Sequence, residues 1–253
     1  MNNFQQTIKN EGSVSGHGLH SGLPVKITLK PASPNHGIRF RRIDLQDSPA
    51  IEASCDFVVC SERSTSLEKN GVKLITIEHL LAALSGMQID NILIELDSEE
   101  LPIMDGSSKP FVDLLKTCEI AVQVETREIF SLKNNIIHKD EKTGAQIIAM
   151  PADTFKVTVM VDYNSQIVGP QHANIEHIDE FEKEIAKCRT FVFFRELEQL
   201  HTSGLIKGGS VENAIVLVDK MPNQGEIDKL ASLFGRSDIE VKSEGYLNNL
   251  ELH

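Results

Sequence analysis

"TIEHLLAALSG", residues 76–86, predicts a short helix with a glutamate and a histidine side by side in its first turn. Leucines follow at helical spacing, so one face of the helix is apolar and should pack on a core. We expect the helix to cover residues 78–87, with the hydroxyl of Thr76 as its N-cap. Glu78 and His79 would then lie together at the rim of that core.

Glu78 and His79 have two interpretations from the residues alone. A neutral imidazole is a good zinc ligand, and a neighbouring carboxylate that does not bind the metal can act as general base for its water. The helix dipole also favours a carboxylate in a first turn. However, glutamate is common in solvated first turns, and a catalytic zinc takes about three protein ligands. The local pattern therefore favours a solvated turn.

Composition limits the class of protein. The 253 residues are 40% hydrophobic and 25% charged, which predicts a globular chain of about two domains. A net charge of −12 argues against nucleic acid as a partner. The four cysteines form no C-x-x-C pair, and the first residues show no signal-peptide pattern. No apolar run approaches the roughly 18 residues of a membrane span. We expect a cytoplasmic protein with reduced thiols and at most peripheral membrane contact.

The first 125 residues, which include this helix, predict one α+β domain. Strands are expected at 24–32, 37–45, 72–77 and 89–98, and a second helix at 108–118. The glycine-rich stretch "GSVSGHGLHSG" before them predicts a β-hairpin region. Residues from 119 to about 130 are expected to cross into a second domain.

Residues 126–253 predict a second α+β domain. Strands at 144–152 and 155–163 are expected to be neighbours joined by the turn "PADT". A helix, a short strand and another helix should follow over 179–204, then a strand at 214–219 and a helix at 224–235. It ends on a strand-like segment with no following helix, and we expect this domain to be incomplete.

The other candidate motifs favour ordinary structure. His17 and His20 lie in a glycine-rich loop, where two polar loop residues are the simpler interpretation. "GLIKGGS" lacks the phosphate-loop pattern and reads as a turn. "PIMDGSS" predicts a turn in which Asp105 accepts hydrogen bonds from backbone donors.

The order of the motifs nevertheless resembles that of a known family. "GLHSG", "NHGIRFRRIDL", "TIEHLLAALSG", "IDNILIEL", "PIMDGSSKPF", "CRTFVFF", "GLIKGGSVENAIV" and "VDY" together resemble the UDP-3-O-acyl-N-acetylglucosamine deacetylases of lipid A biosynthesis. The match runs from about Thr7 to the last residue. "LEKNGVKLITIEHLLAAL" and "PIMDGSSKPFVDLL" also resemble the version fused to a 3-hydroxyacyl-acyl carrier protein dehydratase.

The resemblance implies two α+β domains whose helices are sandwiched between their sheets, with a Zn²⁺ site between the domains. It implies that Glu78 is the base that activates the attacking water, His79 the first zinc ligand, and Thr190 a stabiliser of the tetrahedral oxyanion. The implied residues that bind UDP-3-O-acyl-N-acetylglucosamine are Leu19, His20, Tyr163, Phe191, Leu205 and Gly209. The last two lie in the segment that forms the family's apolar passage for the acyl chain.

Some of the family's metal-binding and catalytic residues have no match in these 253 residues. Its other two zinc ligands come from an H-K-x-x-D type helix, and its general-acid histidine from a later segment. We therefore expect a truncated chain that is inactive alone and binds zinc poorly. Two alternatives are a non-catalytic UDP-sugar-binding or scaffold protein of the same fold, and the N-terminal half of a bifunctional deacetylase and dehydratase.

Overall fold

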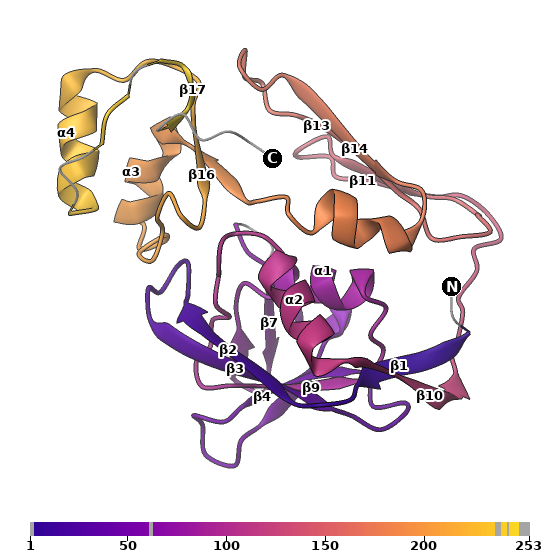
Figure 1. The fold of residues 1–253 in the computed structure, drawn as a ribbon. Helices are drawn as coiled ribbons and strands as arrows, with labels where there is room; N and C mark the ends of the chain where they lie inside the picture. Colours follow the sequence, from indigo (N-terminus) through magenta and orange to yellow (C-terminus); the bar gives the residue numbers. More distant parts are fainter. Residues whose placement is uncertain (1–2, 61–62, 236–238, 242, 248–253) are drawn as a thin grey trace.

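A five-stranded mixed sheet forms the base of the first half of the chain in the computed structural model (Figure 1). The structure describes residues 3–60, 63–235, 239–241 and 243–247. In spatial order the strands are β2 (Gly12–His17), β3 (Pro24–Pro31), β9 (Ile92–Leu96), β4 (Ile38–Arg42) and β5 (Ala50–Glu52). β4 runs parallel to β9, and the other neighbours are antiparallel. The expected hairpin is therefore present as β2 and β3.

Two helices cover one face of this sheet. They are α1 (Glu78–Gly86) and α2 (Lys109–Cys118). Leu80 and Leu84 of α1 and Phe111 of α2 are 0% exposed, and each such side chain stabilises the fold by about 1.5–3 kcal/mol. The predicted apolar periodicity is thus confirmed in both helices.

The predicted N-cap of α1 was wrong. Ile77 occupies the cap position, and no side chain accepts a hydrogen bond there. Thr76 has a φ of 60°, and its hydroxyl instead donates to the Glu100 carboxylate at 3.1 Å. The hydroxyl that the local sequence assigned to the N-cap therefore donates to a buried acceptor 24 residues away in sequence.

Two smaller sheets flank the main one. One consists of β6 (Val58–Cys60), β7 (Ser66–Lys69) and β8 (Val72–Leu74), preceded by the 3-10 turn η1 (Cys55–Phe57). The other pairs β1 (Phe4–Ile8) with β10 (Ile120–Thr126), antiparallel.

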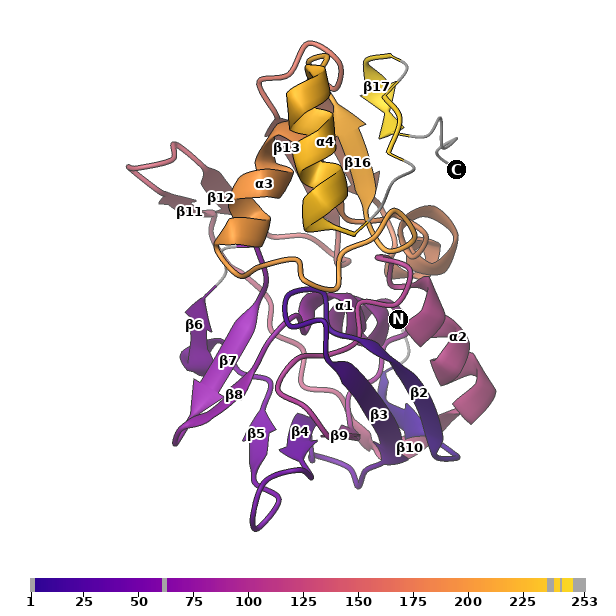
Figure 2. The ribbon, with the colours of Figure 1, turned by 90° about the vertical axis from the view of Figure 1, so that its left-hand side faces the viewer.

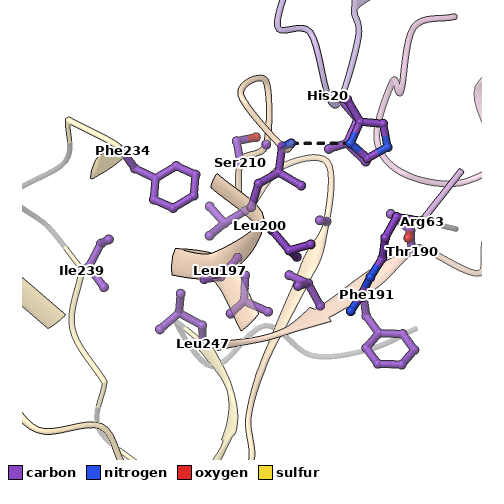
Figure 3. Close-up of a pocket in the computed structure, with 17 residues that line it drawn as sticks. His20, Arg63, Thr190, Phe191, Leu197, Leu200, Ser210, Phe234, Ile239 and Leu247 are labelled. Atoms are coloured by element: carbon purple, nitrogen blue, oxygen red, sulfur yellow. Dashed lines mark hydrogen bonds between the residues drawn. The ribbon is translucent and has the colours of Figure 1, made fainter. Parts of the chain in front are cut away.

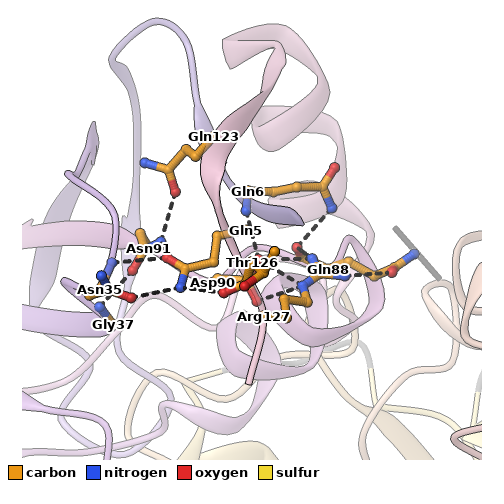
Figure 4. Close-up of polar contacts among 10 residues, drawn as sticks. All are labelled: Gln5, Gln6, Asn35, Gly37, Gln88, Asp90, Asn91, Gln123, Thr126 and Arg127. Carbon is orange, nitrogen blue, oxygen red and sulfur yellow. Dashed lines mark hydrogen bonds and ion pairs between the residues drawn. The ribbon is translucent and has the colours of Figure 1, made fainter. Parts of the chain in front are cut away.

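A polar cluster joins the β1–β10 pair to the main sheet (Figure 4). Asn91, 2% exposed, donates to the side-chain oxygens of Gln5 at 2.8 Å and Gln123 at 2.7 Å. Immediately after β10, the guanidinium of Arg127 donates to the Asp90 carboxylate at 2.8 Å. These contacts hold the chain against the first half at the point where it passes into the second half.

The strands that follow form two separate hairpins. β11 (Ile136–Lys139) pairs with β12 (Gln146–Ala149), and β13 (Val157–Asp162) pairs with β14 (Pro170–Ile175). The predicted pairing of 144–152 with 155–163 through "PADT" was wrong. Gly144 and Gly169 have φ of 74° and 59°, so the tight turns form at these glycines, and the proline-containing segment becomes the connection between hairpins.

A three-stranded sheet with two helices completes the fold. Its strands are β15 (Phe191–Phe193), β16 (Ile215–Val218) and β17 (Gly245–Tyr246), and its helices are α3 (Phe194–Thr202) and α4 (Gln224–Leu233). α3 and α4 lie side by side on one face of β16 (Figure 2). Val216 and Val218 pack toward these helices, whereas Ile215 and Leu217 join an aromatic cluster with Tyr163. Both faces of β16 are buried, which explains its unbroken apolar sequence.

The two halves meet at the C-terminal end of α1. Short helical turns η2 (Ile178–Glu180) and η3 (Phe181–Ile185) precede β15. Phe181 is 5% exposed, and a Cβ on Gly86 would lie 2.0 Å from its ring. α1 and α2 therefore lie between the five-stranded sheet and the second half, in the α+β arrangement expected (Figure 1). Within the described residues, no helix is both long and apolar enough to cross a membrane.

Candidate active site

Glu78 and His79 begin α1, both half-buried. Oε2 of Glu78 accepts a hydrogen bond from the backbone N–H of Thr65 at 2.9 Å. Oε1 makes no hydrogen bond within the described residues, so one oxygen is tethered while the other is available to receive a proton. This is a suitable geometry for a general base.

The environment of His79 favours its neutral form. Burial lowers the pKa of His79 below its ordinary value of 6.5, and the negative charges of Glu78 and Asp105 oppose part of that shift. A neutral imidazole is the form that binds a metal ion. His79 therefore suits the role of a metal ligand.

A loop after β9 connects this helix start to the second half of the chain. Asp105 lies near His79, and its Oδ1 accepts from the backbone N–H of Ser107 at 3.0 Å, as expected of the turn. The next residue, Gly106, accepts from the backbone N–H of Thr190 at 2.8 Å. Gly106 has a φ of 83°, and a Cβ there would lie 2.1 Å from the carbonyl oxygen of Asn213. Only glycine permits this close approach.

Thr190 lies beside this loop. Its backbone N–H and C=O bond to Gly106 and Ile215, while its Oγ1 has no hydrogen-bond partner within the described part of the chain. The preceding residue, Arg189, donates to the backbone oxygens of Asp105 and Glu212, both at 2.7 Å. The backbone of Thr190 is thus fixed by these contacts, while its hydroxyl is available to donate to a ligand.

Thr190 also lines an elongated pocket of about 400 Å³ (Figure 3). The lining is mainly apolar and consists of Leu19, His20, Arg63, Thr190, Phe191, Val192, Leu197, Leu200, Ile206, Gly209, Ser210, Val211, Ala214, Val216, Phe234, Ile239 and Leu247. His20, Arg63 and Thr190 lie toward one end, and Phe234 and Ile239 toward the other (Figure 3). The pocket therefore has a polar end and an apolar end.

His20 carries the pocket's buried polar group. It is 8% exposed, and its Nδ1 faces the backbone N–H of Ile206 at 3.5 Å. Its Nε2 is buried without a hydrogen-bond partner in the described residues. An unpaired buried nitrogen is costly, so a polar group of a ligand would find a partner here.

The residues expected from sequence are not all in one place. Leu19, His20, Thr190, Phe191 and Gly209 line the pocket. Leu205 lies outside its lining and packs against the core of α3 and α4. Tyr163 also lies outside it, in an edge-to-face contact with Phe191 at 5.0 Å between ring centroids. Glu78 and His79 do not line the pocket. Glu78 is linked to it through its hydrogen bond with Thr65, two residues after the lining residue Arg63. The Asp105–Gly106 loop makes the second link, through the hydrogen bond between Gly106 and the lining residue Thr190.

Several site residues were not found by sequence reasoning. Asp105 was interpreted only as a turn residue, although its charge acts on His79. Arg63 at the pocket forms an ion pair of 2.8 Å with Glu196 of α3. The apolar lining from α3 and from the chain after α4 has only ordinary core periodicity as its signal, so it could not be told from a core.

The described residues do not by themselves complete a metal centre. No group of three or more His, Cys, Asp or Glu side chains that could hold a metal occurs in the part of the chain that the structure describes. His79 fits as one ligand, but a catalytic zinc takes about three from the protein.

Comparison with known proteins gives one consistent family. The family model described as "LpxC: UDP-3-O-acyl N-acetylglycosamine deacetylase" matches residues 5–228. A "Bifunctional enzyme LpxC/FabZ" of Bacteroides thetaiotaomicron is 42% identical over 248 residues, which are 98% of this chain and 54% of the relative. One of the same name from Chlorobaculum tepidum is 43% identical over 251 residues, again 98% and 54%.

Relatives with a single activity in their name match over a shorter stretch. A "UDP-3-O-acyl-N-acetylglucosamine deacetylase" of Myxococcus xanthus is 40% identical over 214 residues, which are 84% of this chain and 68% of the relative. The chain thus spans about half the length of the bifunctional relatives that it matches.

Proposed function

Because this chain belongs to the LpxC family of UDP-3-O-acyl-N-acetylglucosamine deacetylases, we propose that it forms the N-terminal part of an enzyme that hydrolyses the N-acetyl amide of UDP-3-O-(3-hydroxyacyl)-N-acetylglucosamine in lipid A biosynthesis. Amide hydrolysis needs a base for the attacking water and a donor for the oxyanion. The observation that carries the proposal is the Asp105–Gly106 loop, in which the charge of Asp105 acts on His79 and the carbonyl of Gly106 accepts from the backbone N–H of Thr190.

In this proposal Glu78 is the general base. The N–H of Thr65 holds Oε2, which leaves Oε1 to take the proton of the attacking water. The hydroxyl of Thr190 then donates to the oxygen that becomes negative as the tetrahedral intermediate forms. Each role uses an atom that has no competing hydrogen bond within the described residues.

His79 is proposed as one ligand of Zn²⁺. The support is its half-buried position and a lowered pKa, which keeps the ring neutral near pH 7. The remaining ligands, and the acid that protonates the departing sugar amine, would have to come from residues that the structure does not describe.

The pocket is proposed to take the acyl chain of the substrate. Its far end is apolar, while Thr190 and His20 at the near end suit the polar region where the chain joins the sugar. Selection of chain length would follow from burial, at about 0.8 kcal/mol per CH₂ group. Leu205 and Tyr163, which lie outside the lining, remain predicted substrate contacts.

Two bifunctional relatives suggest the protein's further organisation. We propose that the natural protein also carries a 3-hydroxyacyl-acyl carrier protein dehydratase domain, that residues 1–125 and 126–253 form the two domains of the deacetylase part, and that the enzyme acts in the cytoplasm.

The proposal is tested by acetate release from UDP-3-O-(3-hydroxytetradecanoyl)-N-acetylglucosamine. The enzyme is the full product of the gene, loaded with Zn²⁺, and His79→Ala is the comparison. We expect acetate release that is lost together with bound zinc in the variant. Binding of the substrate without acetate release would favour the alternative of a non-catalytic UDP-sugar-binding protein.

A further inference from the structure

We infer that Glu100 is a positioning residue, which holds the start of α1 and the turn that carries His20 in fixed relation. Its carboxylate is 1% exposed. Oε1 accepts from the backbone N–H of His20 at 2.8 Å and from the hydroxyl of Thr76 at 3.1 Å, and Oε2 accepts from the backbone N–H of Ser21 at 2.8 Å. The inference rests on the proposed function, because it assigns a role within that same site.

The burial of this carboxylate calls for an explanation beyond packing. Glu100 forms no ion pair with a basic side chain in the described part of the chain, and only the three neutral donors above compensate its charge. A buried charge is expensive unless it is fully hydrogen-bonded. The carboxylate therefore holds two segments together, the turn that carries His20 and Ser21 and the entry to α1 at Thr76.

One of these segments leads directly into Glu78 and His79. Thr76 precedes Glu78 by two residues and has a φ of 60°, which is unusual for a β-branched residue. The backbone beside it is fixed as well, since Ile75 donates to Glu99 at 2.8 Å and accepts from Leu101 at 3.1 Å. The hydroxyl bond to Glu100 adds a side-chain contact to these backbone bonds at the strained entry to α1.

The second segment is the turn around Gly18–Gly22, which packs on Glu100 without space to spare. A Cβ on Gly18 would lie 2.2 Å from Oε2 of Glu100. On its other side the turn meets the pocket wall, since Leu19 and His20 accept from the backbone N–H groups of Gly208 at 3.0 Å and Lys207 at 3.3 Å. A shift of this turn would therefore move the imidazole of His20 and the wall of the pocket.

The experiment uses the full gene product and two readouts. One is kcat for deacetylation, and the other is the Kd of dodecanoate, which probes the pocket without chemistry. Glu100→Gln puts an NH₂ group against an N–H or O–H donor, and Glu99→Gln, at an exposed neighbour, is the matched control. We expect Glu100→Gln to lower kcat on the order of 10²-fold and to raise the dodecanoate Kd about tenfold, because small displacements are costly in a preorganised site.

A second pair of variants separates the two segments and remains informative if Glu100→Gln misfolds. Thr76→Val keeps the β-branched shape but loses the hydroxyl, and it should lower kcat about tenfold while the dodecanoate Kd stays unchanged. Thr76→Ser restores the hydroxyl and should recover most of kcat.

The outcomes that overturn the inference are specific. It fails if folded Glu100→Gln keeps both kcat and the Kd within about threefold of the control, or if Thr76→Ser is as impaired as Thr76→Val. If the wild-type protein releases no acetate, the proposed function fails instead. In that case the role of Glu100 is decided by comparing the dodecanoate Kd of Glu100→Gln with that of Glu99→Gln.

Discussion

Substitution of Gly86 by alanine tests how the two halves of the chain are joined. The Cβ of alanine would lie 2.0 Å from Cδ1 and 2.3 Å from Cγ of the Phe181 ring, which is 5% exposed and has little room to move. Overpacking of this kind costs about 1–3 kcal/mol. Alanine regains up to about 1 kcal/mol of helix propensity, and less at the last residue of α1. We therefore expect a net loss of about 1–2 kcal/mol in the free energy of unfolding.

The assay is urea unfolding of dilute protein, followed by circular dichroism. Ser85→Ala is the matched control, because its side chain is exposed in the same helical turn and should be neutral or slightly stabilising. In a Phe181→Ala background the ring is absent, so Gly86→Ala should lose its penalty and show a coupling energy of about 1 kcal/mol or more. Equal stability of Gly86→Ala and Ser85→Ala would refute the packing of the second half on α1.

Three further predictions concern the thiols, self-association and zinc content. Burial raises the pKa of the Cys118 thiol, and Cys118 is 1% exposed. A disulfide reagent should therefore modify the exposed Cys55, Cys60 and Cys188 first and Cys118 only on unfolding. Equal modification rates for all four thiols would contradict this. The hairpins β11–β12 and β13–β14 expose apolar side chains such as Ile137 at 66% and Met160 at 80%, so the 253-residue chain alone should self-associate, and a monomer in sedimentation would count against this. The same chain should retain far less than one Zn²⁺ ion per molecule after dialysis, because its described residues offer no complete set of ligands. One Zn²⁺ ion per molecule would contradict this prediction.

The helices and the central strand were predictable because their patterns are local. α1, α2 and α4 follow from apolar residues at helical spacing, and β9 follows from the short apolar run "ILIEL". The pairing of strands was less accessible. The hairpins after residue 130 depend on left-handed glycines, and a single sequence does not say which turn signal, Gly144 or "PADT", will direct the chain.

The candidate site was predictable only in part for a similar reason. Glu78, His79 and Thr190 were proposed through the order of family motifs, since their local spacing favoured ordinary structure. The contacts that organise them join residues far apart in sequence, such as Asp105 with Arg189, or Glu100 with His20. Thr76 shows the limit most clearly, because its hydroxyl bonds to Glu100 rather than capping α1. No local pattern encodes such a partner.

The rate of acetate release by Glu78→Gln, in the zinc-loaded full gene product, decides whether Glu78 is the catalytic base. Glutamine keeps an oxygen that can accept from the N–H of Thr65, but it cannot take a proton from water. We predict that kcat falls by about 10²–10⁴-fold while substrate affinity and zinc content stay near those of the wild type. A Glu78→Gln enzyme with wild-type kcat would contradict the assignment of this helix start as the catalytic base.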